Sequence, residues 1–226
     1  MDSAVAKRAA GEAAALLIEE GMLVGLGTGS TALFFIEALA KRCREGLKIL
    51  AAATSIRSRM TAEQLGIPLI QDHAITQLDL AVDGADEIDP DKNMIKGGGG
   101  ALLREKILAH TARELIIVVD EKKCVLALGS FPVPVELLPF AYRSTLSRLE
   151  KEGYQAILRL SPHHTPYMTD NGNFIADIHF KYPILNPEKE EEKLKKISGV
   201  LETGFFYRVA GRVIIGLSKG GTEISS

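Results

Sequence analysis

Residues 22–31, MLVGLGTGST, join the short apolar run Met22–Leu26 to a glycine-rich turn. Helical periodicity follows from Thr31 to Arg44, so this segment is expected to form a strand, a loop and a helix. Short apolar runs and helical segments keep alternating up to about residue 120, which predicts a parallel sheet with crossover helices. The expected strands are residues 22–26, 48–53, 78–82 and 115–119, and the expected helices are residues 4–20, 31–44, 56–65 and 100–112.

The pattern changes beyond Ser130. A helix, two strands and a second helix are expected there, at residues 142–152, 154–160, 174–180 and 187–197. This order predicts a small antiparallel α+β unit. Residues 205–209 and 212–217 have β character again. The expected fold class is therefore α/β, with a mostly parallel sheet domain (residues 1–130 and 205–226) and a second, smaller α+β domain (residues 131–204).

Charge and composition narrow the class of protein. The chain has 27 Lys and Arg residues against 29 Asp and Glu residues, so it lacks the basic surplus of a nucleic-acid binder. The uncharged stretch Gly21–Ile36 is too short and too polar to span a membrane, and Lys7 and Glu12 interrupt any secretory leader. Cys43 and Cys124 match no metal or redox spacing. We expect a cytoplasmic protein without nucleic-acid or membrane partners.

The first motif that could bind a ligand is the turn at residues 25–31, GLGTGST. Its glycines allow backbone N–H groups to approach a phosphate, the following helix N-terminus favours an anion, and Thr28, Ser30 and Thr31 add hydroxyl groups. Ser30 stands where the dinucleotide fingerprint requires a third glycine, and no nucleotide P-loop ending follows. The alternative is a structural turn with a Ser/Thr cap.

The second motif is acidic. Residues 83–91 contain five carboxylates: Asp83, Asp86, Glu87, Asp89 and Asp91. This density of negative charge requires compensation. A divalent metal, a solvated acidic turn and pairing with the nearby cation Lys96 are the alternatives, although the spacing is not that of a calcium loop.

The third motif is KGGGGALLREK, residues 96–106. Four successive glycines carry an entropic cost, so they indicate either a flexible linker or a loop that approaches a ligand. On the helix that follows, the neighbours of Glu105 one turn away are all apolar, so its carboxylate is expected to face something else. Arg104 has nearly as apolar a neighbourhood.

All three motifs follow a predicted strand, which is where open α/β sheets bind their ligands. Lys123 lies just beyond the strand that ends near Asp120, at the same edge of the sheet, but lysines are common in such places. The five histidines are isolated or lie beside prolines, so we assign no metal site.

In this order and spacing, GLGTGSTA (residues 25–32), DGADEID (83–89) and KGGGGALLREK (96–106) closely resemble type A ribose-5-phosphate isomerase. The similarity extends over most of the chain, including VPVE (133–136) and TDNGN (169–173), and is weakest between Tyr154 and Tyr167. It implies a Rossmann-like domain with a smaller α+β domain, a homodimer or homotetramer, and no metal or cofactor. The family has Gly or Ala after the third glycine, so Gly100 is no departure.

The resemblance also implies an activity, the interconversion of ribose 5-phosphate and ribulose 5-phosphate. Glu105 matches the catalytic base, which would act through a cis-enediolate. Lys96 and the glycine N–H groups are candidates to stabilise the developing oxyanion, and Asp83 is the candidate for ring opening, with Asp86 holding hydroxyl groups. The matching substrate-binding positions are Thr28, Gly29, Ser30, Thr31, Asp83, Gly84, Ala85, Asp86, Lys96, Gly97, Gly98, Gly99 and Lys123.

Two other functions are weighed against this one. A sugar-phosphate sensor of a transcription regulator can share such a fold, but the 24 residues before Gly25 are too few for a DNA-binding module. A lactonase or deaminase acting on another phosphosugar is the stronger rival, because a fold does not determine its chemistry. The presence of all three motifs favours the isomerase.

Overall fold

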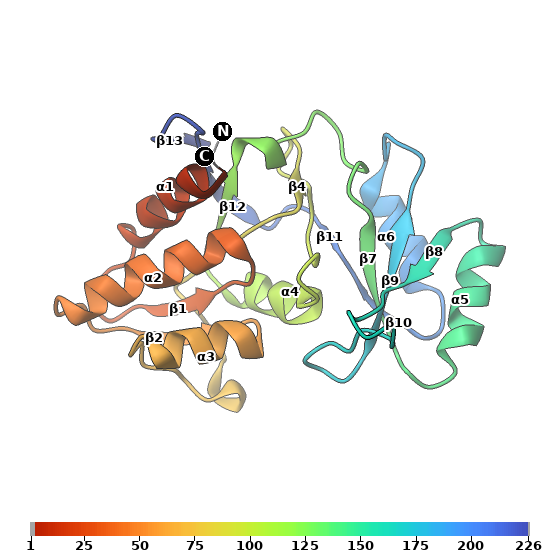
Figure 1. The fold of residues 1–226 in the computed structure, drawn as a ribbon, viewed down its shortest axis with the longest axis horizontal. Helices are drawn as coiled ribbons and strands as arrows, with labels where there is room; N and C mark the ends of the chain where they lie inside the picture. Colours follow the sequence, from red (N-terminus) through yellow and green to blue (C-terminus); the bar gives the residue numbers. More distant parts are fainter. Residues whose placement is uncertain (1–2, 226) are drawn as a thin grey trace. The chain divides into compact units, whose positions relative to one another are not determined.

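The computed structural model describes residues 3–225, and Figure 1 follows their path. The chain divides into two compact units. Unit 1 comprises the chain up to Ala85, Arg104–Cys124 and the chain from Val209 onward, and unit 2 comprises Asp86–Leu103 and Val125–Arg208. These boundaries differ from the expected ones, since residues 86–103, 125–130 and 205–208 group with unit 2.

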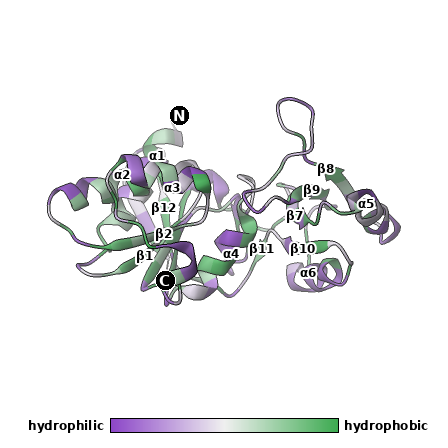
Figure 2. Ribbon diagram, turned by 90° about the horizontal axis from the view of Figure 1, so that it is seen from below, coloured by the Kyte–Doolittle hydropathy of each residue, from purple (hydrophilic) through white to green (hydrophobic). Residues whose placement is uncertain are grey.

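A six-stranded sheet forms the centre of unit 1, in the order β13-β12-β6-β3-β1-β2. All neighbouring strands are parallel except β12 and β13. All six residues of β6 (Leu115–Asp120) are buried, as expected for a central strand covered on both faces. The other strands are β1 (Leu23–Leu26), β2 (Leu50–Ala53), β3 (Leu80–Asp83), β12 (Ala210–Gly216) and β13 (Thr222–Ser225). The predicted α/β fold class is confirmed, and Figure 2 shows β1 and β2 as mainly hydrophobic.

Helices cover both faces of this sheet. Ala51 belongs to the core that the strands share with α1 (Ser3–Ala15), α2 (Ser30–Arg44) and α3 (Ile56–Gln64). Ala52 packs with Leu108 of α4 (Leu102–Thr111). Successive strand residues point to opposite faces, so α4 lies on the face opposite α1, α2 and α3. Among residues 3–225, none of the helices combines the length and apolar character needed to cross a membrane.

The prediction of a helix over residues 4–20 was wrong in its length, because α1 ends at Ala15. Arg42 of α2 donates hydrogen bonds from Nη1 to the carbonyl oxygens of Ala15 and Ile18. This tertiary contact stabilises a turn where the periodicity alone indicates more helix.

Unit 2 contains two antiparallel sheets. The larger has the order β10-β7-β9-β8, and its core includes Leu149 of α5 and Leu194 of α6. The smaller has the order β11-β5-β4. The elements are β4 (Glu87–Ile88), β5 (Met94–Ile95), β7 (Val133–Leu137), α5 (Tyr142–Lys151), β8 (Gln155–Leu158), β9 (Phe174–His179), α6 (Pro187–Lys195), β10 (Val200–Thr203) and β11 (Phe205–Phe206).

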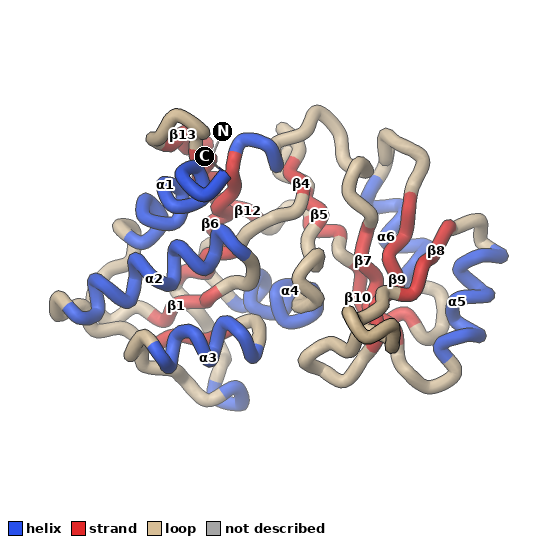
Figure 3. The backbone as a smooth tube through the Cα atoms, viewed as in Figure 1, coloured by secondary structure: helices blue, strands red, loops and turns tan. Residues whose placement is uncertain are grey.

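The small sheet explains why unit 2 begins at residue 86. Phe205 of β11 pairs with Ile95 of β5, and the N–H of Val125 donates to the carbonyl of Ile88. Residues 205–208 therefore group with unit 2 and not, as expected, with the parallel-sheet domain. Strands of two residues, drawn as short red segments in Figure 3, are too short to show any sequence periodicity.

Candidate active site

The carboxyl ends of β1 and β3 form the topological switch point of unit 1. The two strands are neighbours, but the chain leaves β1 through α2 to reach β2 on one side, and only then returns through α3 to β3 on the other side. Open α/β sheets bind ligands at such a point, because the loops diverge there. The first motif follows β1, and the acidic motif follows β3.

The loop after β1 has the backbone of an anion-binding turn. Gly29 adopts a φ of 118° and precedes α2, which begins at Ser30. A side chain is disfavoured at this angle, so glycine is required. Gly29 and Ser30 are exposed whereas Thr31 is buried. The N–H groups in the first turn of a helix have no acceptor within that helix, so they can donate to a ligand. This geometry is suited to an anion, and the binding of a phosphate by this loop stays a prediction.

A cluster of hydroxyl groups, which the sequence motifs do not reveal, fixes this loop. The Oγ1 of Thr28 lies 2.7 Å from Thr54 Oγ1, 2.8 Å from Ser55 Oγ and 3.3 Å from Ser58 Oγ. Ser58 in turn donates to the carbonyl of Gly27 at 2.7 Å. Thr28 thus uses its hydroxyl group to position the loop. The available signal was the run Thr54–Ser58, which follows β2, the strand next to β1.

Asp83 connects the ends of β1 and β3. Its side chain is buried, and its Oδ1 accepts hydrogen bonds from the N–H groups of Thr28 at 3.0 Å and Gly84 at 2.7 Å. A Cβ atom on Gly27 would lie 2.2 Å from the same oxygen. Glycine is therefore needed at position 27 for the close approach, and Asp83 helps to shape the phosphate-type loop.

Backbone N–H groups compensate much of the negative charge of the acidic motif. This source of compensation differs from the three expected alternatives, which were a metal, a solvated turn and Lys96. In unit 2, Asp86 accepts from the N–H of Gly98 at 2.7 Å, and Asp89 accepts from the N–H of Asn93 at 2.8 Å. Glu87 accepts from the N–H groups of two residues, Gly129 and Phe131. Among the described residues, no group of three or more His, Cys, Asp or Glu side chains is arranged to hold a metal ion.

The glycine motif is a shaped loop in unit 2. Gly97 and Gly100 have φ values of 97° and 82°, and a Cβ on Gly98 would lie 2.7 Å from Asp86 Oδ1. Glycine is needed at these positions because a side chain would clash or be strained. The loop is therefore not a flexible linker. The loop follows β5 of the small antiparallel sheet, which corrects the expectation that all three motifs follow strands of one parallel sheet.

Lys96 at the start of this loop is a buried cation. Only 2% of the residue is exposed, and its Nζ lies 5.3 Å from the centre of the Phe206 ring. The backbone N–H of Lys96 donates to the carbonyl of Gly204 at 2.9 Å, which fixes the chain where the glycines begin. Because the side chain is buried and the backbone is fixed, the ammonium group of Lys96 has little freedom to move.

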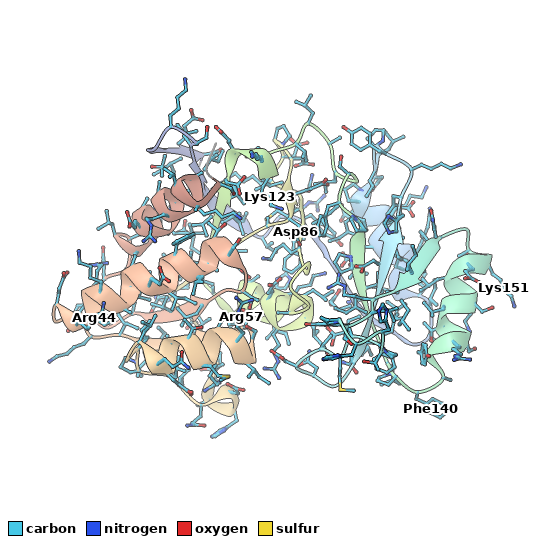
Figure 4. All side chains as sticks on the ribbon, viewed as in Figure 1. Arg44, Arg57, Asp86, Lys123, Phe140 and Lys151 are labelled. Carbon is cyan, nitrogen blue, oxygen red and sulfur yellow. The ribbon has the colours of Figure 1, made fainter. Side chains whose placement is uncertain are left out.

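Glu105 lies in the first turn of α4 and is only 4% exposed. The N-terminal end of a helix favours a carboxylate, and burial limits its contact with water. Lys123 is half-buried in the short helix Glu121–Lys123 that follows β6. Figure 4 labels Lys123 and also the exposed Arg57 in the first turn of α3, both in unit 1.

The predicted residues divide between the units. Hydrogen bonds join Thr28 to Asp83 in unit 1 and Gly98 to Asp86 in unit 2. Lys96 lies in the loop after β5, Glu105 in α4 and Lys123 in the short helix that follows β6. Unit 1 contains Thr28, Gly29, Ser30, Thr31, Asp83, Gly84, Ala85, Glu105 and Lys123, and unit 2 contains Asp86, Lys96, Gly97, Gly98 and Gly99.

Known proteins resemble this chain in both sequence and structure. The family model for ribose 5-phosphate isomerase A (phosphoriboisomerase A) matches residues 50–220. Ribose-5-phosphate isomerase A of Protochlamydia amoebophila (strain UWE25) is 52% identical over 97% of this chain and 94% of its own length. The solved ribose 5-phosphate isomerase A of Methanocaldococcus jannaschii is 39% identical, with a TM-score of 0.91 over 97% of each chain.

A second solved structure, of D-ribose-5-phosphate isomerase in complex with phospho-erythronic acid, is 38% identical with a TM-score of 0.94 over 100% of both chains. The match therefore covers both units, including the three motifs and the helix that carries Glu105. On this evidence the chain belongs to the ribose 5-phosphate isomerase A family.

Proposed function

We propose that this chain interconverts D-ribose 5-phosphate and D-ribulose 5-phosphate, the reaction for which its family is named. The observation that carries the proposal is that unit 1 holds both a phosphate-type loop at residues 27–31 and a buried carboxylate, Glu105. The substrate requires both features. Its phosphate is an anion remote from the reacting carbons, and its isomerisation requires a base.

Glu105 moves the proton in this proposal. Its carboxylate removes the proton from C2 of the open-chain aldose, and the electron pair forms the C1–C2 double bond while the C1 carbonyl oxygen becomes an oxyanion. The resulting species is a cis-enediolate. Glu105 then returns a proton to C1, the hydroxyl group on C2 gives up its proton to the oxygen on C1, and the C2 carbonyl forms.

Lys96 and the N–H groups of Gly97 and Gly99 stabilise the enediolate oxygens. The N–H of Gly98 donates to Asp86 instead. A fixed cation and fixed amide donors are effective in a site that excludes water, because they need no reorganisation as the charge develops. The burial of Lys96 and the steric fixation of the glycines support this role.

The remaining residues bind and open the sugar. Gly29, Ser30 and Thr31 hold the phosphate, with Thr28 and Asp83 shaping their loop. Asp83 also acts in ring opening, Asp86 holds sugar hydroxyl groups, and Lys123, Gly84 and Ala85 complete the substrate contacts. These roles follow from the family motifs, as does our proposal of a homodimer or homotetramer without a metal or cofactor. We also propose that the protein works in the cytoplasm.

The test is a coupled assay of the purified protein with ribose 5-phosphate. Glu105→Gln should keep the fold and lower kcat by roughly 10² to 10⁴, the usual contribution of a positioned general base. The matched control is Glu191→Gln, which alters another buried helical carboxylate and should retain wild-type kcat. A wild-type protein inactive on ribose 5-phosphate would overturn the proposed reaction, and an active Glu105→Gln variant would overturn the role of Glu105.

A further inference from the structure

Three successive carbonyl groups of the glycine loop accept hydrogen bonds from the segment that follows β8. Arg159 donates from Nη1 to the oxygens of Gly97 at 3.1 Å and Gly98 at 3.2 Å. Tyr167 donates from its hydroxyl group to the oxygen of Gly99 at 3.3 Å. All these residues belong to unit 2. Neither Arg159 nor Tyr167 is among the site residues identified from the sequence.

Arg159 is held in place by an ion pair. Its Nε donates to Oδ2 of Asp177 at 2.8 Å, and its Nη2 donates to Oδ1 of the same carboxylate. The two side chains are 16% and 19% exposed. Four of the five guanidinium N–H groups are therefore used by the protein. These hydrogen bonds hold the glycine loop in place, and Asp177 balances the charge of Arg159.

Tyr167 is fixed from two directions. Its backbone N–H donates to the carbonyl of Arg159 at 2.8 Å. Two residues later, Thr169 donates from its hydroxyl group to the fully buried carboxylate of Glu136 at 3.0 Å. Burial raises the pKa of the Tyr167 hydroxyl group above its ordinary value, so the group stays protonated and able to donate to Gly99.

Holding these carbonyl groups sets the direction of the N–H groups. The peptide group is planar and trans, so each C=O points away from the N–H of the next residue. The bond to the Gly97 carbonyl therefore orients the N–H of Gly98, which donates to Asp86 at 2.7 Å. In the same way, the bond to the Gly98 carbonyl directs the N–H of Gly99 away from Arg159.

We propose that Arg159 and Tyr167 are positioning residues for the isomerisation, which fix the glycine loop so that the N–H of Gly99 points at the developing enediolate. This inference rests on the proposed function. It predicts that the two residues affect the transition state more than the binding of substrate. Arg159 acts through the loop, because four of its five N–H donors are already used within the protein.

The first test is Arg159→Lys, which retains the positive charge beside Asp177 but lacks the planar fork needed to reach both carbonyl groups. It should lower kcat by about 10- to 100-fold, the range for a misplaced donor, and change the KM for ribose 5-phosphate by less than about three-fold. Tyr167→Phe keeps the ring and removes one neutral hydrogen bond. It should lower kcat by about three- to ten-fold.

A second readout is the binding of phospho-erythronic acid, measured by titration calorimetry. Its carboxylate is planar and shares negative charge between two oxygens, as an enediolate does. Its affinity for Arg159→Lys should fall by the same factor as kcat/KM. If the role of Arg159 were purely structural, Arg159→Lys would instead raise the KM and weaken the binding of ribose 5-phosphate and of phospho-erythronic acid by the same factor.

The matched control is Arg212→Lys. Arg212 forms the same two-bond contact with Glu114, from Nε at 2.6 Å and from Nη2 at 2.8 Å, in unit 1. It should retain wild-type kcat and affinity. If the wild-type protein isomerises ribose 5-phosphate but Arg159→Lys and Tyr167→Phe keep its kcat, the positioning role is overturned while the proposed function stands. If the wild-type protein is inactive, the proposed function itself fails.

Discussion

Gly100→Ala should disturb the glycine loop, even though an alanine at this position fits the family pattern. Gly100 has a φ of 82°, and an added Cβ would lie 2.3 Å from the hydroxyl oxygen of Tyr167. The left-handed backbone costs a residue with a side chain about 1–2 kcal/mol. Moving the tyrosine breaks its bond to Gly99, which costs about 1 kcal/mol more. The free energy of unfolding should therefore fall by about 2–3 kcal/mol.

Urea denaturation followed by circular dichroism measures this change, and kcat/KM measures its effect on the loop. Gly153→Ala is the matched control, since Gly153 has a φ of 89° with nothing within 4 Å of its added Cβ. It should lose only the backbone part, about 1–2 kcal/mol, and keep wild-type kcat/KM. In Gly100→Ala/Tyr167→Ala the clash is absent, so the two effects should be less than additive. A Gly100→Ala variant with the stability and kcat/KM of the wild-type protein would refute this reasoning.

Three further predictions concern the phosphate, the acidic motif and pH. Free ribose should be used with a kcat/KM lower by at least about 10³, and Thr31→Ala should impair turnover of ribose 5-phosphate but not of ribose; equal losses would argue against a phosphate loop. Activity should survive exhaustive chelation by EDTA, and its loss with recovery on adding a divalent ion would favour a metal. Hydrogen bonds from Arg212 lower the pKa of Glu114, so this pair should stabilise the fold above the ordinary glutamate pKa and lose its effect as the pH falls through the lowered value. Urea midpoints of Glu114→Gln should therefore depend less on pH between 7 and 3 than those of the wild-type protein.

The fold of unit 1 could be predicted largely from local sequence patterns. Met22–Leu26 is apolar, Gly29 permits a positive φ, and helical periodicity begins close to the observed start of α2 at Ser30. Each of these signals lies within a few residues of the element that it predicts. The phosphate-type loop could be located for the same reason.

The features that could not be predicted depend on contacts between distant residues. The strand β5 has two residues and exists because β11, more than a hundred positions later, pairs with it. The contact of Arg159 with Asp177 depends on the register of β8 and β9, in which Ile157 lies opposite Asp177. Likewise, the backbone N–H groups that compensate the charge of the acidic motif cannot be recognised in a sequence, because every residue except proline has a backbone N–H group.

The most direct test of the account follows the proton that Glu105 is proposed to move. Ribose 5-phosphate labelled with deuterium at C2 is incubated with the wild-type protein and with Glu105→Gln, and the loss of label from C2 is followed by NMR. The wild-type protein should remove the label with a primary isotope effect on kcat/KM, and Glu105→Gln should slow both removal and turnover by the same factor, about 10² to 10⁴. Removal of the C2 label by Glu105→Gln at the wild-type rate would contradict the account.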